Sequence, residues 1–453
     1  MTAKPLSLKR RAMYAGSWMI TGHFSAQVLR LVSNLILTRL LVPEMFGLMS
    51  AVSVVLIGIN MFSDIGLLQN IVQSQRGSQR LFLNTAWTIQ IIRGFLIYFI
   101  AALLCLALYF VQSAGILTGD TVYADPTLPI LLAIAALSAP IFGFLSVNIF
   151  VQRRNLAASK ITILELSSQV IGLIVTIFLA WLWRDIWALL LGNIVSAVIK
   201  VAGSHLKTFG DRPALQLDRS CAKEILNFGK WVFVGSIFGF CLNHGDRLLL
   251  GGLVTAKVLG IYNIAYFLAM AAKELLFTLF KSIFFPVLSE TFRNAPQDVE
   301  RIYYKIRIKI DGVSMFAAGF LFASGTNIIK IMYDDRYHEA GHYLEILGLS
   351  LVATGFSLAN QCFLAHGKAK LTTALIASQV FILYTVVPLA FVTSGINGVI
   401  WAIAATPVAN ALISLYLMKK YLFLNLKREF IMLPMILAGY AVGALTIAQI
   451  NLN

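Results

Sequence analysis

The stretch Met13–Leu41, MYAGSWMITGHFSAQVLRLVSNLILTRLL, decides the fold, because it is long and apolar enough to cross a membrane as a helix. Side chains three or four residues apart share one helix face, and here they form a polar stripe of His23, Gln27, Arg30, Asn34 and Thr38. An arginine in the middle of a span costs about 2.5–3.5 kcal/mol to insert. We therefore expect Arg30 to face a bundle interior or a water-filled cavity.

The composition extends this interpretation to the whole chain. Of the 453 residues, 59% are hydrophobic and only 12% are charged, and the mean hydropathy is +0.81. A soluble protein of this length is not so apolar, so the sequence predicts an all-α polytopic membrane protein. The four cysteines form no close pair and no metal-ligand cluster is apparent, so we expect neither disulfides nor a metal or other cofactor.

Thirteen apolar segments are long enough to span the hydrocarbon core. They cover residues 13–41, 46–72, 81–111, 128–151, 159–182, 186–205, 224–253, 258–288, 306–332, 338–365, 371–394, 397–418 and 429–449. Short connections join them, and the mixed-charge connection Ser289–Tyr304 predicts a surface helix.

The basic residues of the connections indicate the orientation. With the N-terminus in the cytoplasm, almost all of them lie on the cytoplasmic side, Arg307 among them, and only Arg184, Lys257 and Arg336 lie opposite. The net charge of +16 is then a topological signal and a match to anionic membrane lipids. It gives no reason to expect a nucleic-acid partner.

Five basic residues lie within spans, where their side chains reach the headgroups less easily. Arg30, Arg93 and Lys273 are the deepest, and Arg247 and Lys281 are intermediate. Such residues face a cavity or form a structural ion pair inside the bundle, and the sequence leaves both alternatives open.

Carboxylates inside a membrane are candidates for ion coupling. Asp64 and Glu165 have no basic neighbour within four residues, so we expect them at ion-coupling positions, with helix capping or packing as the alternative. Asp311 lies two residues from Lys309, so neutralisation by this neighbour explains its presence.

The chain also repeats itself weakly. A shift of 213 residues places Leu41–Ser53 on Val254–Tyr266 and Arg30 on Asn243. We therefore expect an N-lobe at 1–222, a C-lobe of six spans at 223–422 and an additional transmembrane helix at 423–453. Because each lobe has an even number of spans, the repeats are expected to be parallel.

Four segments carry a resemblance to a known family. They are FGLMSAVSVVLIGINMFSDIGLLQNIVQSQR (46–76), LGIYNIAYFLAM (259–270), FFPVLSETFRN (284–294) and IKIMYDDRYHEAGHYLEIL (329–347). The chain resembles the polysaccharide-transporter branch of the multidrug/oligosaccharidyl-lipid/polysaccharide (MOP) superfamily, which includes Wzx-type and colanic-acid exporter-like flippases. The resemblance implies a V-shaped bundle of two six-helix lobes around a central cavity. The thirteenth span departs from the common twelve.

The resemblance also implies a function. Such a protein moves an oligosaccharide repeat unit on a polyprenyl diphosphate from the cytoplasmic to the periplasmic leaflet of the bacterial inner membrane, by alternating access, for surface polysaccharide synthesis. It is not an enzyme, a proton or sodium gradient is the expected driving force, and a polymerase and export machinery are expected partners.

The polar residues inside the membrane suit this cargo. Guanidinium and ammonium groups pair with phosphate oxygens, so we expect Arg30, Arg247, Arg93, Lys273 and Lys281 to bind the diphosphate. Side chains expected to bind sugar hydroxyls are His23, Gln27, Asn34, Asn60 and Asn243. Hydrogen bonding between helices is the alternative for this second set.

Three other functions remain open. A lipid II-type flippase has a cargo with the same diphosphate. A drug or cation antiporter of the same superfamily would favour an acidic cavity, whereas the deep residues here are mostly basic. A membrane polymerase or ligase usually has a sizeable periplasmic loop, and the connections here are short.

Overall fold

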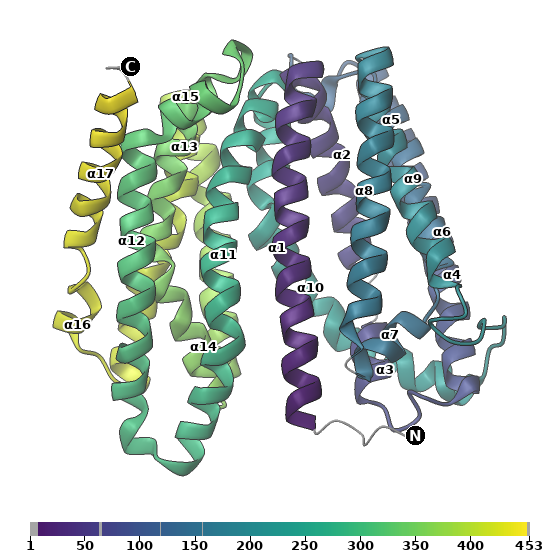
Figure 1. Ribbon diagram of the computed structural model, residues 1–453. Coiled ribbons are helices and arrows are strands. Elements are labelled where there is room, and N and C mark those ends of the chain that lie inside the picture. The colour runs from purple at the N-terminus through teal and green to yellow at the C-terminus, as the bar shows by residue number, and fades with distance from the viewer. Residues whose placement is uncertain (1–7, 63–65, 118, 156, 451–453) are drawn as a thin grey trace. The chain divides into compact units, whose positions relative to one another are not determined.

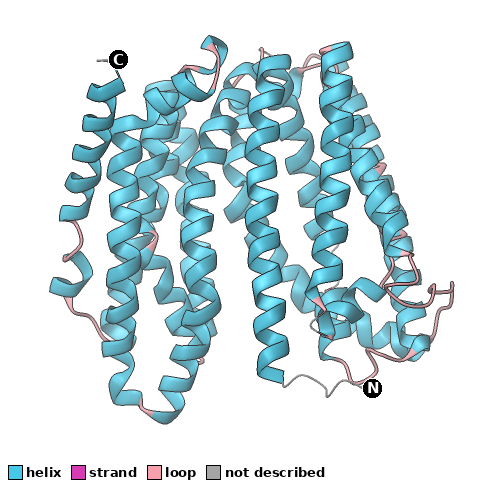
Figure 2. Ribbon diagram, in the orientation of Figure 1, coloured by secondary structure: helices cyan, strands magenta, loops and turns pink. Residues whose placement is uncertain are grey.

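The computed structural model describes residues 8–62, 66–117, 119–155 and 157–450. These residues form helices and connecting loops, with no strand among them (Figures 1 and 2). Within the same ranges, seven helices are long and apolar enough to cross a membrane, or up to nine if each bent pair is one span. The all-α membrane class is therefore confirmed, and the chain is a multi-pass membrane protein, whereas the arrangement of twelve spans plus one is not established.

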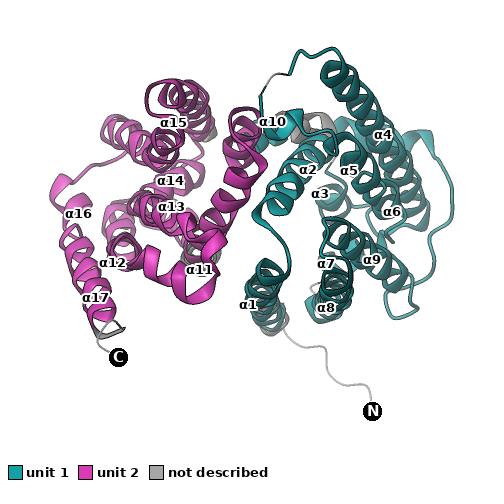
Figure 3. Ribbon diagram, turned by 90° about the horizontal axis from the view of Figure 1, so that it is seen from above, with its two compact units in different colours: residues 1–240 teal, residues 241–453 magenta. Residues whose placement is uncertain are grey.

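By its internal contacts the chain divides into two compact units, residues 1–240 and 241–453, coloured separately in Figure 3. The division falls inside a single helix, α10 (Arg219–Leu253). The other helices of unit 1 are α1 (Leu8–Leu40), α2 (Pro43–Phe62), α3 (Leu67–Gln73), α4 (Arg80–Ser113), η1 (Val122–Ala124), α5 (Leu128–Ala135), α6 (Ser138–Gly143), α7 (Asn148–Arg154), α8 (Ala158–Trp183) and α9 (Trp187–Ser204).

Two predicted spans of unit 1 are interrupted. The segment 46–72 is divided between α2 and α3. The segment 128–151 is divided among α5, α6 and α7, and its last part bends by 64°. Broken helices are tolerated at membrane depth where protein or a water-filled cavity satisfies the freed backbone groups. These interruptions border the cavity described below.

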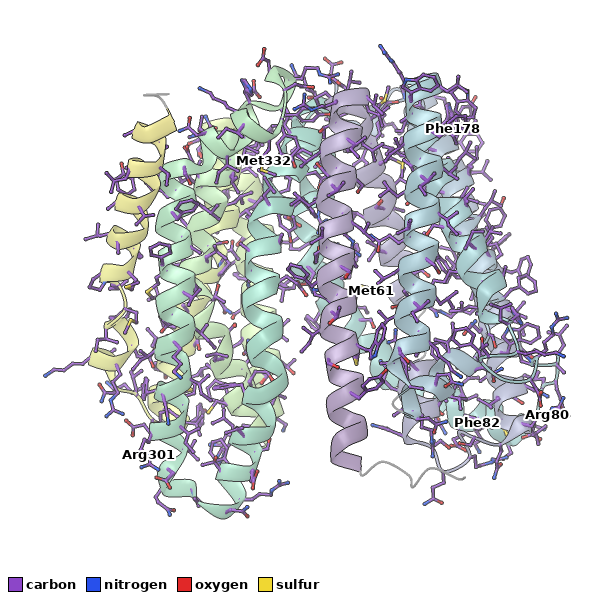
Figure 4. The ribbon with its side chains drawn as sticks, in the orientation of Figure 1. Met61, Arg80, Phe82, Phe178, Arg301 and Met332 are labelled. Carbon is purple, nitrogen blue, oxygen red and sulfur yellow. The ribbon has the colours of Figure 1, made fainter. Side chains whose placement is uncertain are left out.

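Small residues allow the helices of unit 1 to approach closely. A Cβ on Gly192 of α9 would lie 1.7 Å from the hydroxyl of Thr176 on α8, and a Cβ on Gly94 of α4 would lie 2.7 Å from the carbonyl of Ala139 on α6. The inside and the outside of unit 1 differ: Phe82 is wholly buried, whereas Phe178 is 58% exposed. Figure 4 labels both side chains. Exposed apolar side chains of this kind are what a lipid-facing surface requires.

Unit 2 continues the chain from the end of α10. Its helices are α11 (Ala256–Asn294), η2 (Pro296–Asp298), α12 (Val299–Met332), η3 (Asp335–Tyr337), α13 (Glu339–Gly348), η4 (Leu349–Ala353), η5 (Gly355–Ser357), α14 (Leu358–Ala365), α15 (Ala369–Tyr421), α16 (Leu426–Phe430) and α17 (Pro434–Ile450). The long α15 is two helices joined at Gly395, whose φ of 60° breaks the helix. This break lies between the predicted spans 371–394 and 397–418.

The predicted surface helix at Ser289–Tyr304 is wrong. Its first part is the end of α11, and its last part is the first turn of α12. Tyr303 and Tyr304 are buried, at 0% and 1% exposure, in the core of unit 2. The charges of the connection suggested a solvated helix, but the two tyrosines pack against Phe284 and Phe363 instead.

Helix α17 packs along α12 at one edge of unit 2 (Figure 1). A Cβ on Gly319 of α12 would lie 1.9 Å from the carbonyl oxygen of Ile436, and a Cβ on Gly439 would lie 2.0 Å from that of Phe316. Only glycine permits backbones to approach so closely at these two positions. The additional C-terminal helix is therefore tightly packed against unit 2.

Candidate functional site

The polar stripe of α1 changes character along the helix. Arg30 is exposed, His23, Gln27 and Asn34 are half-buried, and Thr38 is only 1% exposed. The hydroxyl of Thr38 donates to the carbonyl of Leu35 on its own helix. The part of the stripe that is open within unit 1 is therefore its first three turns, and Thr38 is a packing residue.

The imidazole of His23 lies in this open part. Its Nε2 atom is buried and makes no hydrogen bond within the described part of the chain. Next to His23 and one turn later, α1 packs against α8: a Cβ on Gly22 would lie 2.4 Å from the methyl group of Thr162, and Gln169 donates to the carbonyl of Ala26 at 3.4 Å. These contacts hold the turn that carries His23.

Arg93 and Asn60 come together at a cavity inside unit 1. Nη2 of Arg93 on α4 donates to the backbone carbonyl of Asn60 on α2 at 2.7 Å, and Nδ2 of Asn60 donates to the carbonyl of Leu56 at 2.9 Å. The cavity has a volume of about 270 Å³, and Gln69 and Gln90 also line it. Its described lining includes no acidic residue.

Gln90 holds the broken helix beside this cavity. Its side-chain amide donates to the backbone carbonyls of Phe142, Gly143 and Leu145, at 3.2, 3.0 and 2.8 Å. These carbonyls lie where α6 ends, so their helical partners are missing. Gln90 thereby stabilises the wall of the cavity opposite Asn60.

Arg247 and Asn243 come together in unit 2. Nη2 of Arg247 donates to the carbonyl of Asn243 at 2.8 Å and lies 3.2 Å from Nδ1 of His244. The guanidinium also stacks on the ring of Tyr266, 4.6 Å from its centroid.

Asp246 offsets the charge of Arg247. Its Oδ1 atom lies 3.7 Å from Nε of Arg247, and its Oδ2 accepts a short hydrogen bond from the hydroxyl of Tyr262 on α11. Asp246 and Tyr262 are 4% and 0% exposed. Of the two alternatives left open by the sequence, a structural ion pair therefore holds for Arg247, whose side chain is 18% exposed.

Glu165 is paired, although its sequence neighbours are not basic. Its Oε1 atom lies 3.3 Å from Nη2 of Arg153 on α7 and 3.3 Å from Nζ of Lys200 on α9. Both partners come from other helices, which the local sequence could not indicate. The carboxylate is 40% exposed, so water screens these pairs.

The structure describes the remaining predicted site residues only in part. Lys273 is half-buried on α11, next to the exposed Glu274. Lys281 lies on the same helix, but its side chain is outside the described part of the structure, and Asp64 lies outside the described residues altogether.

The sequence analysis missed a buried charge cluster in unit 2. Arg307, counted there among the loop cations, is wholly buried on α12, and the partner of Asp311 is Arg307 rather than Lys309. Glu429 of α16 completes the cluster. The spacing of four residues between Arg307 and Asp311 was the available signal, since such pairs meet on a helix.

Comparison with known proteins identifies the family. Residues 36–342 match the model of a family described as polysaccharide biosynthesis protein. The chain belongs to this polysaccharide biosynthesis family. The match runs from the end of α1 to the start of α13, and the resemblance noted in the sequence is confirmed.

Two curated proteins are similar to this polysaccharide biosynthesis protein. The lipopolysaccharide biosynthesis protein WzxC of Escherichia coli K12 is 22% identical over 98% of this chain and 90% of its own length. The succinoglycan biosynthesis transport protein ExoT of Rhizobium meliloti is 23% identical over 74% of this chain and 65% of its own length.

Solved structures show that the polysaccharide biosynthesis protein has the MOP-superfamily fold. The lipid II flippase MurJ in an inward closed conformation aligns with a TM-score of 0.68 at 12% identity, covering 96% of this chain and 99% of that one. An inward-facing multidrug MATE transporter of the MOP superfamily aligns with a TM-score of 0.65 at 15% identity, covering 87% and 94%.

Proposed function

We propose that this protein is a flippase that translocates a polyprenyl-diphosphate-linked oligosaccharide repeat unit from the cytoplasmic to the periplasmic leaflet, for surface polysaccharide synthesis. Two relatives are named for lipopolysaccharide biosynthesis and for succinoglycan transport, and MurJ for flipping lipid II. A lipid-linked saccharide is a cargo compatible with all three names. The bacterial inner membrane, with the N-terminus cytoplasmic, is the proposed location.

The observation that carries this proposal is the arginine at the cavity of unit 1. Bare phosphate charges cost many kcal/mol in hydrocarbon, so a translocated diphosphate needs cationic partners. Arg93 places a guanidinium at a cavity of about 270 Å³, where the polar side chains of Gln69 and Gln90 also line the space. We propose that Arg93 and the exposed Arg30 bind the diphosphate, supported by Lys273 and Lys281.

The uncharged polar side chains and His23 within the predicted spans are proposed to bind sugar hydroxyls. His23 supports this role best, because its buried Nε2 atom makes no hydrogen bond in the described part of the chain. Gln27, Asn34, Asn60 and Asn243 are the other candidates. Arg247, whose charge Asp246 offsets, is proposed to act through its hydrogen bonds and its stacked face.

Two aspects of the proposal concern energy and assembly. We propose that transport is coupled to a proton or sodium gradient, for which Asp64 and Glu165 are the candidate positions. We also propose a polymerase and export machinery as partners. Glu165 is the weaker candidate, because it pairs with Arg153 and Lys200.

The alternatives differ in cargo. A lipid II-type flippase differs only in the saccharide, and a cation antiporter would need accessible carboxylates where Arg30 and Arg93 lie. A polymerase or ligase would change the glycan covalently. We propose that the protein moves the glycan unchanged.

The experiment is a flipping assay with the full chain in proteoliposomes. A lipid-diphosphate-linked oligosaccharide is supplied in one leaflet, and its appearance in the other is followed by a membrane-impermeant modification of the sugar. Arg93→Ala and Arg30→Ala are expected to abolish transport. Arg80→Ala, at the exposed start of the same helix as Arg93 (Figure 4), is the control and is expected to transport normally.

The outcomes separate the alternatives. Equal transport of lipid II and of the repeat-unit lipid would favour a general lipid-diphosphate flippase. Transport of an organic cation but of neither lipid would refute the proposal, as would wild-type rates in both cavity variants.

A further inference from the structure

A cluster of charges lies buried in unit 2, apart from the residues proposed to bind cargo. Nε of Arg307 lies 3.1 Å from Oδ2 of Asp311, and Nη1 lies 2.6 Å from Oε2 of Glu429. Nη1 also donates to the hydroxyl of Tyr303 at 2.8 Å, and the ring of Phe356 covers the guanidinium at 4.2 Å. The charged side chains are 1%, 1% and 0% exposed.

The charges of this cluster do not balance. It holds two carboxylates and one guanidinium, so the fully ionised form would bury a net negative charge. The titratable and charged neighbours from the packed elements are Tyr303, Tyr304, Cys362 and Arg428. The tyrosines and the cysteine are neutral at physiological pH, and Arg428 is exposed to solvent, as are Lys305 and Lys309. A buried unpaired charge is strongly unfavourable, and a single bound proton removes it.

Hydrogen bonding distinguishes the two carboxylates. Glu429 is contacted at both oxygens, since the hydroxyl of Tyr304 donates to Oε1 at 2.8 Å and Oε2 forms the ion pair with Nη1 of Arg307 at 2.6 Å. Asp311 is contacted only at Oδ2, and its Oδ1 atom is buried without a hydrogen-bond partner among the described residues. Donors stabilise the ionised form of a carboxylate. Asp311 is therefore the better site for the proton.

The backbone shapes the space around this oxygen. A Cβ on Gly355, in the connection between η4 and α14, would lie 1.6 Å from Oδ1 of Asp311. The glycine thus leaves room for the carboxyl group and for nothing larger. A proton fits this space, whereas a metal ion with several oxygen ligands does not.

We propose that Asp311 binds an exchangeable proton at Oδ1, and that this proton controls how tightly α16 is held against α12. When the proton leaves, two carboxylates compete for Arg307, and the excess charge is relieved if Glu429 moves to water. That movement is short, because Glu429 lies between the exposed residues Arg428 and Phe430. The hydroxyl of Tyr304 also accepts from the backbone of Asn425 at 2.9 Å, which links the cluster to the half-buried start of α16.

The first test measures the thermal unfolding midpoint of the purified full chain against pH. The native protein holds the proposed proton over a pH range in which the same carboxyl group of the unfolded chain is already ionised. The midpoint is therefore expected to fall by several degrees as the pH rises through the range in which Asp311 loses its proton. Asp311→Asn places an uncharged amide at the same position and is expected to remove this dependence.

The second test observes the proton directly. The infrared absorption of a protonated carboxyl group is expected in the wild type at mildly acidic pH and is expected to disappear as the pH rises. Asp311→Asn removes it at all pH values. Glu429→Gln also removes it, because Arg307 then has one anionic partner and Asp311 stays ionised. Glu290→Gln, an exposed acid at the end of α11, is the control and keeps it.

The third test concerns α16 itself. Trypsin cleavage after Lys427 and Arg428 is expected to accelerate at alkaline pH in the wild type and to stay slow in Asp311→Asn. An unfolding midpoint with the same pH dependence in wild type and Asp311→Asn would overturn the proposal. So would the absence of a carboxyl absorption that the Asp311 and Glu429 variants remove.

Discussion

Arg307 and Glu429 lie on different helices, yet Nη1 of the arginine is 2.6 Å from Oε2 of the glutamate and both side chains are completely buried. Through this pair, α16 is held against the first turns of α12, and α17 follows along the rest of the same helix. Helix α17 is therefore an integral part of unit 2.

Replacement of Arg307 by Met is expected to destabilise the protein by about 3–5 kcal/mol, because it leaves two buried carboxylates without their cation. The loss is measured as reduced yield of folded protein and a lower unfolding midpoint in detergent. Arg301→Met is the control, since this arginine is 75% exposed and pairs with Asp298 at the surface (Figure 4). Its effect should stay within about 1 kcal/mol. Equal stability of the two variants would contradict the role given to the cluster.

The contact between α12 and α17 predicts a strong effect of side-chain size at Gly439. Leucine there cannot fit against the backbone of Phe316, so Gly439→Leu is expected to cost at least about 1–3 kcal/mol by overpacking or to detach α17. Protease protection of the C-terminal helix measures this. Ala441→Leu, an exposed position on the same helix, should leave protection unchanged. Protection in both variants would refute the close packing.

Arg93→Lys tests whether the guanidinium shape matters at the cavity. Lysine keeps the charge but loses the fork that bonds two oxygens and the contact to Asn60. Affinity for a lipid diphosphate is expected to fall about tenfold or more, which corresponds to about 1.4 kcal/mol or more. Calorimetry with a short-chain lipid diphosphate measures it, with Arg80→Lys as the control. Equal affinities would place the diphosphate elsewhere.

Tyr262→Phe removes the hydroxyl that donates to the buried Asp246. We expect a loss of about 1–3 kcal/mol in stability, because a buried carboxylate oxygen loses its donor. Tyr109→Phe, at a position 60% exposed, is the control and should have no measurable effect. If Tyr262→Phe also leaves the unfolding midpoint unchanged, Asp246 does not depend on this hydrogen bond.

Glu165→Gln is expected to change stability by at most about 1 kcal/mol, because its pairs with Arg153 and Lys200 are partly exposed. If these pairs are only structural, the dependence of transport on a proton or sodium gradient stays as in the wild type. Loss of that dependence in a folded, transporting variant would establish Glu165 as a coupling site.

The cavity residues show what could be predicted from the local sequence and what could not. The depth of Arg93 in its span marked it as a residue needing a polar environment, and the structure places it at a cavity. The interaction partners of Arg93 could not be predicted from the sequence. Asn60, which contacts Arg93, was expected to bind sugar through its side chain, whereas the structure shows its backbone carbonyl as the acceptor. Whether a backbone carbonyl is available as a hydrogen-bond acceptor depends on helix geometry, and the residue type does not indicate this.

The sequence by itself determined that this is an all-helical membrane protein, because hydropathy and helical periodicity are properties of neighbouring residues. Its family was indicated by the resemblance of particular segments and shown by the family match over residues 36–342. Only the tertiary structure decided which charges meet. Glu165 pairs with Arg153 and Lys200, and Arg307 pairs with Glu429. These partners lie on separate helices and become neighbours only when the helices pack. The energy of a buried charge depends on those neighbours, so its role is fixed by the fold and not by its place in the chain.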